Sequence, residues 1–99
     1  MGLARYNLAI ALLESGRPHD ALASARLAWN QRRQGVGEYE GAKASFVMAR
    51  VLWAAEPRSR REAAALARGA LEFYETDARF ADHAEEVRAW LAERPGARR

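Results

Sequence analysis

Apolar side chains recur along almost the whole chain at intervals of three and four residues, with polar residues between them. This spacing matches the turn of an α-helix, and no stretch alternates apolar and polar residues for long enough to predict a strand. We therefore predict an all-α fold. Glycine and proline positions divide the pattern into five helices, over about residues 3–15, 18–34, 38–55, 59–75 and 77–94.

The predicted helix ends carry residues that stop or start helices. Gly16 can adopt the left-handed conformation that closes a helix, and Pro18 suits the first turn of the next one. Pro57 prevents the third helix from continuing. Ser59 and Glu62 have the spacing of a capping box, in which each side chain binds a free backbone N–H at the start of the fourth helix. The linker between the second and third helices is Gly35-Val36-Gly37.

The fifth predicted helix has one apolar and one charged face. Thr76 and Asp77 are its candidate N-caps. Its apolar stripe consists of Phe80, Ala84, Val87, Trp90 and Leu91, and its polar face of Asp82, Glu85, Glu86, Arg88 and Glu93. An amphipathic helix of this kind can shield the last apolar surface of a helical array from water.

The first helix, in contrast, is apolar on two sides, which predicts two neighbours. One stripe, expected to face the second helix, consists of Leu8, Ala9 and Leu12; the other consists of Leu3, Tyr6, Ile10 and Leu13. The second neighbour is the third helix, a further helix, a second copy of the chain or a ligand. The sequence does not choose among them.

A spaced pattern of apolar residues occurs twice, about forty residues apart, as expected of stacked helical hairpins. The first instance is Leu8-Ala9-x-x-Leu12 with Ala21 and Ala28; the second is Met48-Ala49-x-x-Leu52 with Ala63 and Ala70. We predict one domain over residues 1–99, formed by a hairpin at 3–34, a hairpin at 38–75 and a capping helix at 77–94.

The first hairpin, with Arg5-x-x-Leu8-Ala9-x-x-Leu12, Gly16, Ala21, Ala25 and Ala28, resembles a tetratricopeptide (TPR) repeat, in a variant with a longer repeat. The resemblance implies a right-handed α-solenoid. From Gly35 onward, Phe46-x-x-Ala49-Arg50-x-x-Trp53 and Val87-x-Ala89-Trp90-Leu91 are similar to TPR tails of bacterial serine/threonine kinases. This similarity implies a regulatory or scaffolding module.

TPR arrays bind a peptide or a partner helix in the groove lined by the first helix of each hairpin. The resemblance places in this groove Tyr6, Asn7, Ile10, Leu13, Lys43, Phe46, Arg50 and Trp53. Some members capture a C-terminal carboxylate with Lys, Arg and Asn side chains from three hairpins. Only Asn7, Lys43 and Arg50 are available for that role here, which argues against such capture.

Composition narrows the possible settings of the chain. It has 99 residues, 49% of them hydrophobic and 29% charged, and no cysteine, which fits a cytoplasmic protein without disulfides. The run Leu8–Leu13 is too short to span a membrane. Abundant arginine and alanine are typical of a GC-rich bacterial genome. The net charge of +3 leaves a nucleic-acid alternative open, with phosphate contacts from Arg58, Arg60, Arg61 and Arg68.

Candidate catalytic chemistry is sparse. His19 and His83 have no ligand at the spacing of a recognised metal motif, and no serine lies in a nucleophile motif. We expect His83 at the edge of the core and His19 in solvent. We therefore predict a protein that is not an enzyme and has no metal or cofactor. Its expected role is to bind a protein or peptide in the groove; nucleic-acid association and self-association through the first helix are the alternatives.

Overall fold

The computed structural model describes residues 2–31 and 38–94, and these form five α-helices and no strand. The helices are α1 (Gly2–Glu14), α2 (Pro18–Gln31), α3 (Glu38–Ala55), α4 (Arg60–Tyr74) and α5 (Ala81–Ala92). Short 3-10 turns, η1 (Pro57–Ser59) and η2 (Ala78–Phe80), precede α4 and α5. The prediction of an all-α fold is confirmed. The linker at residues 35–37 and the predicted extension of α2 through residues 32–34 lie outside the described residues.

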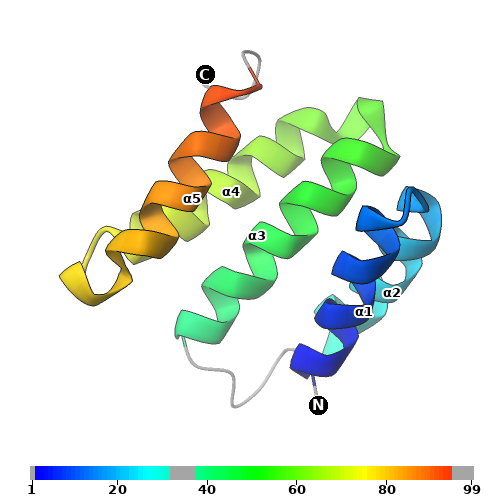
Figure 1. The fold of residues 1–99 in the computed structure, drawn as a ribbon, viewed down its shortest axis with the longest axis horizontal. Helices are drawn as coiled ribbons and strands as arrows, with labels where there is room; N and C mark the ends of the chain where they lie inside the picture. The colour runs from blue at the N-terminus through cyan, green and yellow to red at the C-terminus, as the bar shows by residue number, and fades with distance from the viewer. Residues whose placement is uncertain (1, 32–37, 95–99) are drawn as a thin grey trace.

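The helices form two hairpins and a fifth helix. α1 pairs with α2, and α3 pairs with α4; α3 also contacts both helices of the first hairpin, and α5 contacts α4. The molecule measures 34 × 33 × 20 Å. In Figure 1, α1, α3 and α5 lie toward the viewer, and α2 and α4 lie behind them. α3 is therefore the central helix, with neighbours on both sides.

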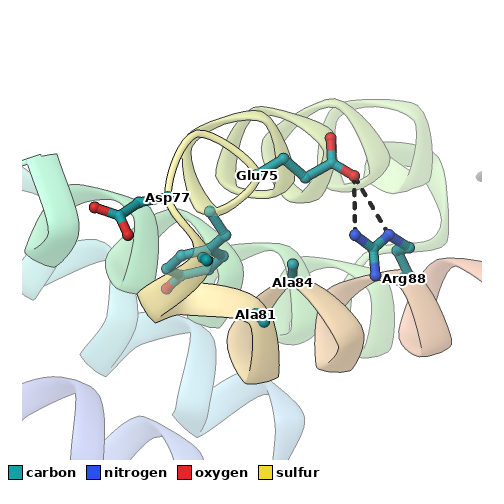
Figure 2. Close-up of a pocket in the computed structure, with 7 residues that line it drawn as sticks. Glu75, Asp77, Ala81, Ala84 and Arg88 are labelled. Atoms are coloured by element: carbon teal, nitrogen blue, oxygen red, sulfur yellow. Dashed lines mark hydrogen bonds and ion pairs between the residues drawn. The ribbon is translucent and has the colours of Figure 1, made fainter.

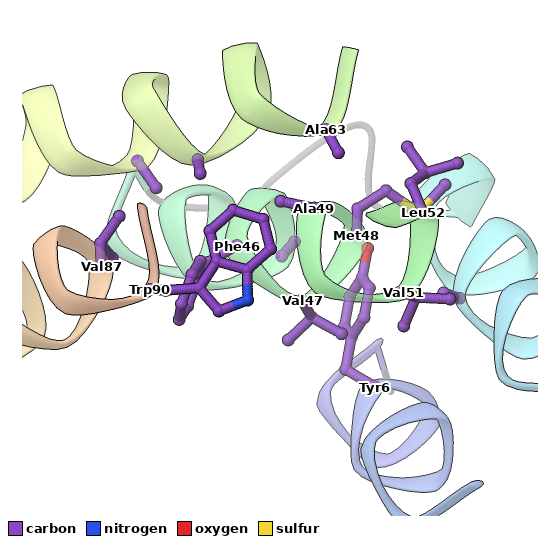
Figure 3. Close-up of a cluster of buried hydrophobic side chains, with 14 of the residues drawn as sticks. Tyr6, Phe46, Val47, Met48, Ala49, Val51, Leu52, Ala63, Val87 and Trp90 are labelled. Atoms are coloured by element: carbon purple, nitrogen blue, oxygen red, sulfur yellow. The ribbon is translucent and has the colours of Figure 1, made fainter. Parts of the chain in front are cut away.

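Alanines fill the contacts between paired helices. In the first hairpin Ala9, Ala21, Ala25 and Ala28 are completely buried, and in the second Ala49, Ala63 and Ala67 are. Side chains this small let two helix backbones approach closely. The largest side chains that are fully buried are Val51 and Leu52 of α3 and Val87 of α5 (Figure 3).

The turn between α1 and α2 follows the sequence prediction. Gly16 has φ +79°, the left-handed conformation that glycine adopts without strain. Its N–H donates to the Leu13 carbonyl at 3.1 Å, and the Arg17 N–H donates to the Leu12 carbonyl at 2.9 Å. α2 then begins at Pro18, whose missing N–H has no helical partner to lose.

The prediction that Leu8 faces the second helix is wrong. Leu8 is 54% exposed, whereas Tyr6 and Ala9 are buried. Adjacent residues on a helix point in different directions, so the side of α1 that carries Tyr6 and Ala9 turns Leu8 outward. Met48, the counterpart of Leu8 in the second hairpin, is only 6% exposed, because the first hairpin packs against α3.

The capping box predicted for the fourth helix is also wrong. Ser59 makes no capping hydrogen bond to the start of α4, and its Oγ instead donates to Glu56 Oε1 at 2.9 Å. The cause is the 3-10 turn that follows Pro57, which places Ser59 at the end of one turn rather than in extended backbone ahead of a helix.

Asp77 is an N-cap, as predicted, but of η2 rather than of α5. Its Oδ1 accepts a hydrogen bond from the Arg79 N–H at 2.8 Å, and α5 begins only at Ala81. The predicted apolar stripe of α5 is confirmed: Ala84, Val87, Trp90 and Leu91 are buried and Phe80 is half-buried. The charged residues predicted for the other face are exposed.

Candidate functional site

The structure leaves six of the eight predicted groove residues exposed or half-buried and buries the other two. Asn7 is exposed, and the half-buried members are Ile10, Leu13, Lys43, Arg50 and Trp53. Tyr6 and Phe46 are buried, so the prediction that their side chains line an open surface is wrong. Tyr6 extends from α1 toward Met48 of α3 (Figure 3), and Phe46 is covered by α5.

An aromatic group joins the predicted groove to α5. The Trp90 ring contacts Phe46 and Trp53 of α3, each with centroids 5.7 Å apart and in edge-to-face geometry. Edge-to-face pairs are favourable because the positive edge of one ring meets the negative face of the other. Trp53 remains half-buried, so part of its ring faces solvent at the junction of α3 and α5.

Arginines from α3, from α4 and from the residues after α5 lie over these rings. The Arg94 guanidinium is 4.2 Å from the Trp90 centroid and 5.9 Å from that of Trp53. Arg60 lies 4.9 Å from the Trp53 centroid, and Arg50 lies 5.8 Å from that of Phe46. Such distances allow cation–π attraction. We call these six residues the arginine–aromatic cluster: Phe46, Arg50, Trp53, Arg60, Trp90 and Arg94.

Hydrogen bonds to the backbone hold two of these guanidinium groups. Arg94 Nη1 donates to the Trp90 carbonyl at 2.7 Å, and Arg60 Nε donates to the Trp53 carbonyl at 3.3 Å. In both cases the carbonyl belongs to a tryptophan that the same arginine covers. The two guanidinium groups are thus held in place by contacts within the protein.

The cluster carries an excess of positive charge. Burial lowers the pKa of Arg94, and the neighbouring cations Arg50 and Arg60 lower it further, although Glu93 opposes both effects. Glu93 Oε1 is 3.6 Å from Arg94 Nη1, at the surface. Among residues 2–31 and 38–94, neither Arg50 nor Arg60 forms an ion pair. The cluster is therefore suited to bind an anionic group by charge and by the guanidinium fork.

A second aromatic group lies around the start of α5. His83 Nε2 is 3.2 Å from the Tyr39 hydroxyl, and the His83 ring stacks on Tyr74 with centroids 5.0 Å apart. Burial raises the pKa of Tyr74 to about 12, with smaller contributions from Tyr39 and Glu86. His83 therefore lies at the edge of the core, as the sequence predicts. Its contacts are those of a packed side chain.

A shallow depression of about 420 Å³ lies beside this group, between the end of α4 and α5. Its lining consists of Tyr74, Glu75, Asp77, Ala78, Ala81, Ala84 and Arg88. Arg88 reaches across it to Glu75, with Nη2 and Oε2 3.2 Å apart (Figure 2). The charges lining the depression are thus already paired: Asp77 is also bound by Arg79, which lowers its pKa.

The described residues contain no cluster of His, Asp or Glu that could hold a metal ion. Within the same ranges, no helix has the length and hydrophobicity needed to cross a membrane. His19 is exposed, as predicted. Of the arginines proposed for phosphate contacts, Arg58 and Arg61 are exposed and Arg68 is half-buried, while the Arg60 guanidinium covers Trp53.

In comparisons by sequence and by structure, no protein-family model, curated protein or solved structure matches the chain. The arginine–aromatic cluster thus rests on the geometry of this chain. The sequence prediction did not place Trp90 or Arg94 next to the groove: Trp90 was predicted in the apolar stripe of the fifth helix, where the structure buries it, and Arg94 only as the end of that helix. Their spacing of four residues, which places a cation over an aromatic ring on one helix face, is the signal that could have found them.

Proposed function

We propose that this chain is a cytoplasmic, non-catalytic protein-interaction module, built as a right-handed solenoid of two TPR-like hairpins closed by α5. It binds a peptide or a helix on the surface of α3 where α3 meets α5, with α1 extending the same face. The arginine–aromatic cluster is the observation that carries this proposal. It combines a partly exposed tryptophan with arginines held over it, and both residue types are enriched where protein interfaces gain most of their affinity.

The packing of the helices supports the solenoid part of this proposal. α3 contacts both helices of the first hairpin, and α5 contacts α4 and packs its Trp90 edge-to-face against Phe46 of α3. Each added element therefore buries its apolar side against the element before it, which is how repeat arrays are stabilised. The charged outer face of α5 suits the end of such an array.

Display of a random peptide library tests the proposed function. The affinity of each peptide selected on the wild-type chain is then measured for two variants, Arg50→Gln and Arg17→Gln. Arg17→Gln is the control, because it removes the same charge from the turn of the first hairpin. We expect Arg50→Gln to weaken binding at least threefold and Arg17→Gln to leave it unchanged. Failure to select any peptide, or equal effects of the two variants, would contradict the proposal.

Self-association is a second candidate function, because two large apolar side chains of the first hairpin are exposed. Leu8 of α1 is 54% exposed and Leu27 of α2 is 49% exposed. Met48, the counterpart of Leu8 in the second hairpin, is buried, and a second copy of the chain could cover Leu8 in the same way. If this surface pairs two copies, sedimentation of the wild-type chain will show a concentration-dependent mass that Leu8→Glu abolishes. A monomer at all concentrations would exclude it.

A further inference from the structure

We infer that the arginine–aromatic cluster selects partners whose bound segment carries acidic side chains next to an apolar one. This inference rests on the proposed function and specifies its ligand: a protein segment with Glu or Asp carboxylates that bind Arg50 and Arg60, and an apolar side chain that packs on Trp53. The ligand group is a side-chain carboxylate within a segment, so a free C-terminus is not needed.

The cluster differs in its charge balance from the arginines that have a carboxylate partner. Arg17 is 2.7 Å from Asp20, Arg79 is 2.7 Å from Asp77, and Arg88 is paired with both Glu75 and Glu85. In the cluster, Glu93 is the single carboxylate paired with any of the three arginines within the described ranges. Three cations facing one surface carboxylate leave positive charge that a partner can neutralise.

The arginines are also held in advance, which reduces the entropy lost on binding. Arg60 is fixed by the Trp53 ring and carbonyl, and Arg94 by the Trp90 ring and carbonyl. Arg94 lies among the rings, where its charge lowers the cost of bringing a carboxylate near them. Arg50 and Arg60 are the members that have no ion pair among residues 2–31 and 38–94, and we expect them to pair with a partner's carboxylates.

Charge around the cluster favours a short acidic protein segment over a nucleic acid. Glu93 stands beside Arg94 at the edge of the cluster. A phosphate backbone carries one charge per nucleotide and would meet this carboxylate as its phosphates followed the three arginines. A protein segment can place its few acidic residues only where the cations are.

Three probes test the inference, and the affinity of each for the full chain is measured by titration calorimetry. Two are leucine-containing peptides that are identical except for Glu or Gln at the same positions. The third is an oligo-dT with as many negative charges as the Glu peptide. We expect the Glu peptide to bind at least tenfold more tightly than both the Gln peptide and the oligo-dT.

The matched variants are Arg50→Gln/Arg60→Gln and Arg17→Gln/Arg26→Gln, which lose the same charge at different places. We expect the first pair to remove the preference for Glu over Gln and the second pair to retain it. Equal binding of the two peptides would overturn the acidic specificity while leaving the proposed function intact. Tighter binding of oligo-dT than of the Glu peptide would overturn the inference in favour of a nucleic-acid ligand. If neither peptide binds, the inference is overturned as well. The peptide comparison on the wild-type chain decides the question even if a variant does not fold.

Discussion

The indole ring of Trp90 on α5 stands edge-on to the ring of Phe46 on α3, with centroids 5.7 Å apart and planes inclined by 88°. This contact joins the last helix to the central one. It also explains why Phe46, expected in the groove, belongs to the core: the helix that closes the array covers it.

Replacing Phe46 with alanine should lower the free energy of unfolding by about 3–5 kcal/mol, because a buried ring is lost and a cavity remains. Arg50→Gln, one turn further along the same helix, should change it by less than about 1 kcal/mol, since its side chain is half-buried and has no ion pair within the described ranges. Urea denaturation followed by circular dichroism measures both. Similar values for the two variants would mean that α5 does not cover Phe46.

Ala49→Leu should destabilise the protein by about 1–3 kcal/mol, because a larger side chain forces apart the closely packed helices α3 and α4. Ala49 is fully buried there, opposite the alanine-rich face of α4. Ala54→Leu makes the same substitution at an exposed position of α3 and serves as the control. We expect a lower melting temperature for Ala49→Leu only. An equal decrease in both variants would show that close alanine packing between α3 and α4 does not stabilise the fold.

Tyr74 should make stability depend on pH in the alkaline range. Burial raises its pKa from 10.0 to about 12, so between these values the folded state keeps a proton that the unfolded state loses. The free energy of unfolding should therefore fall as pH rises above 10, by up to about 1.4 kcal/mol per pH unit. Below pH 10 Tyr74 does not make the free energy of unfolding depend on pH. Denaturation of the wild type and of Tyr74→Phe at several pH values isolates this contribution. If the free energy of unfolding falls equally with pH in the two proteins, Tyr74 is not its cause.

The N-cap assignments predict contrasting effects of two small substitutions. Asp77→Ala should cost about 0.5–2 kcal/mol, because its carboxylate caps η2. In a double-mutant cycle, Ser59→Ala and Glu62→Ala should be additive within about 0.5 kcal/mol, since Ser59 binds Glu56 instead of forming a capping box. A larger coupling energy between Ser59 and Glu62 would show that they do form a capping box.

Much of the fold could be predicted because helix signals are local. Alanines at helical spacing mark the contact faces, Pro57 ends α3 near Ala55, and Gly16 and Pro18 define the first turn. Signals that depend on a neighbouring element were less reliable. The Ser59–Glu62 spacing fits a capping box, but Pro57 imposes a 3-10 turn that removes the backbone geometry the motif needs.

The candidate site could be predicted only in part, because it forms between helices. Arg50 and Trp53 are on one helix and were expected on the binding face, but Arg60 comes from the start of α4, and Trp90 and Arg94 come from the end of the chain's last helix and the residues after it. The sequence carries no signal for the angle at which α5 crosses α3. That angle buries Phe46 and brings Arg94 to Trp53.

Binding of a partner where α3 meets α5 can be followed through the indole N–H signals of the three tryptophans in a ¹H–¹⁵N spectrum. Single substitutions Trp29→Phe, Trp53→Phe and Trp90→Phe assign the signals. On addition of a selected peptide, we expect the Trp53 signal to shift and that of Trp29, on the first hairpin, to stay in place. A shift of Trp29 with an unchanged Trp53 would contradict it.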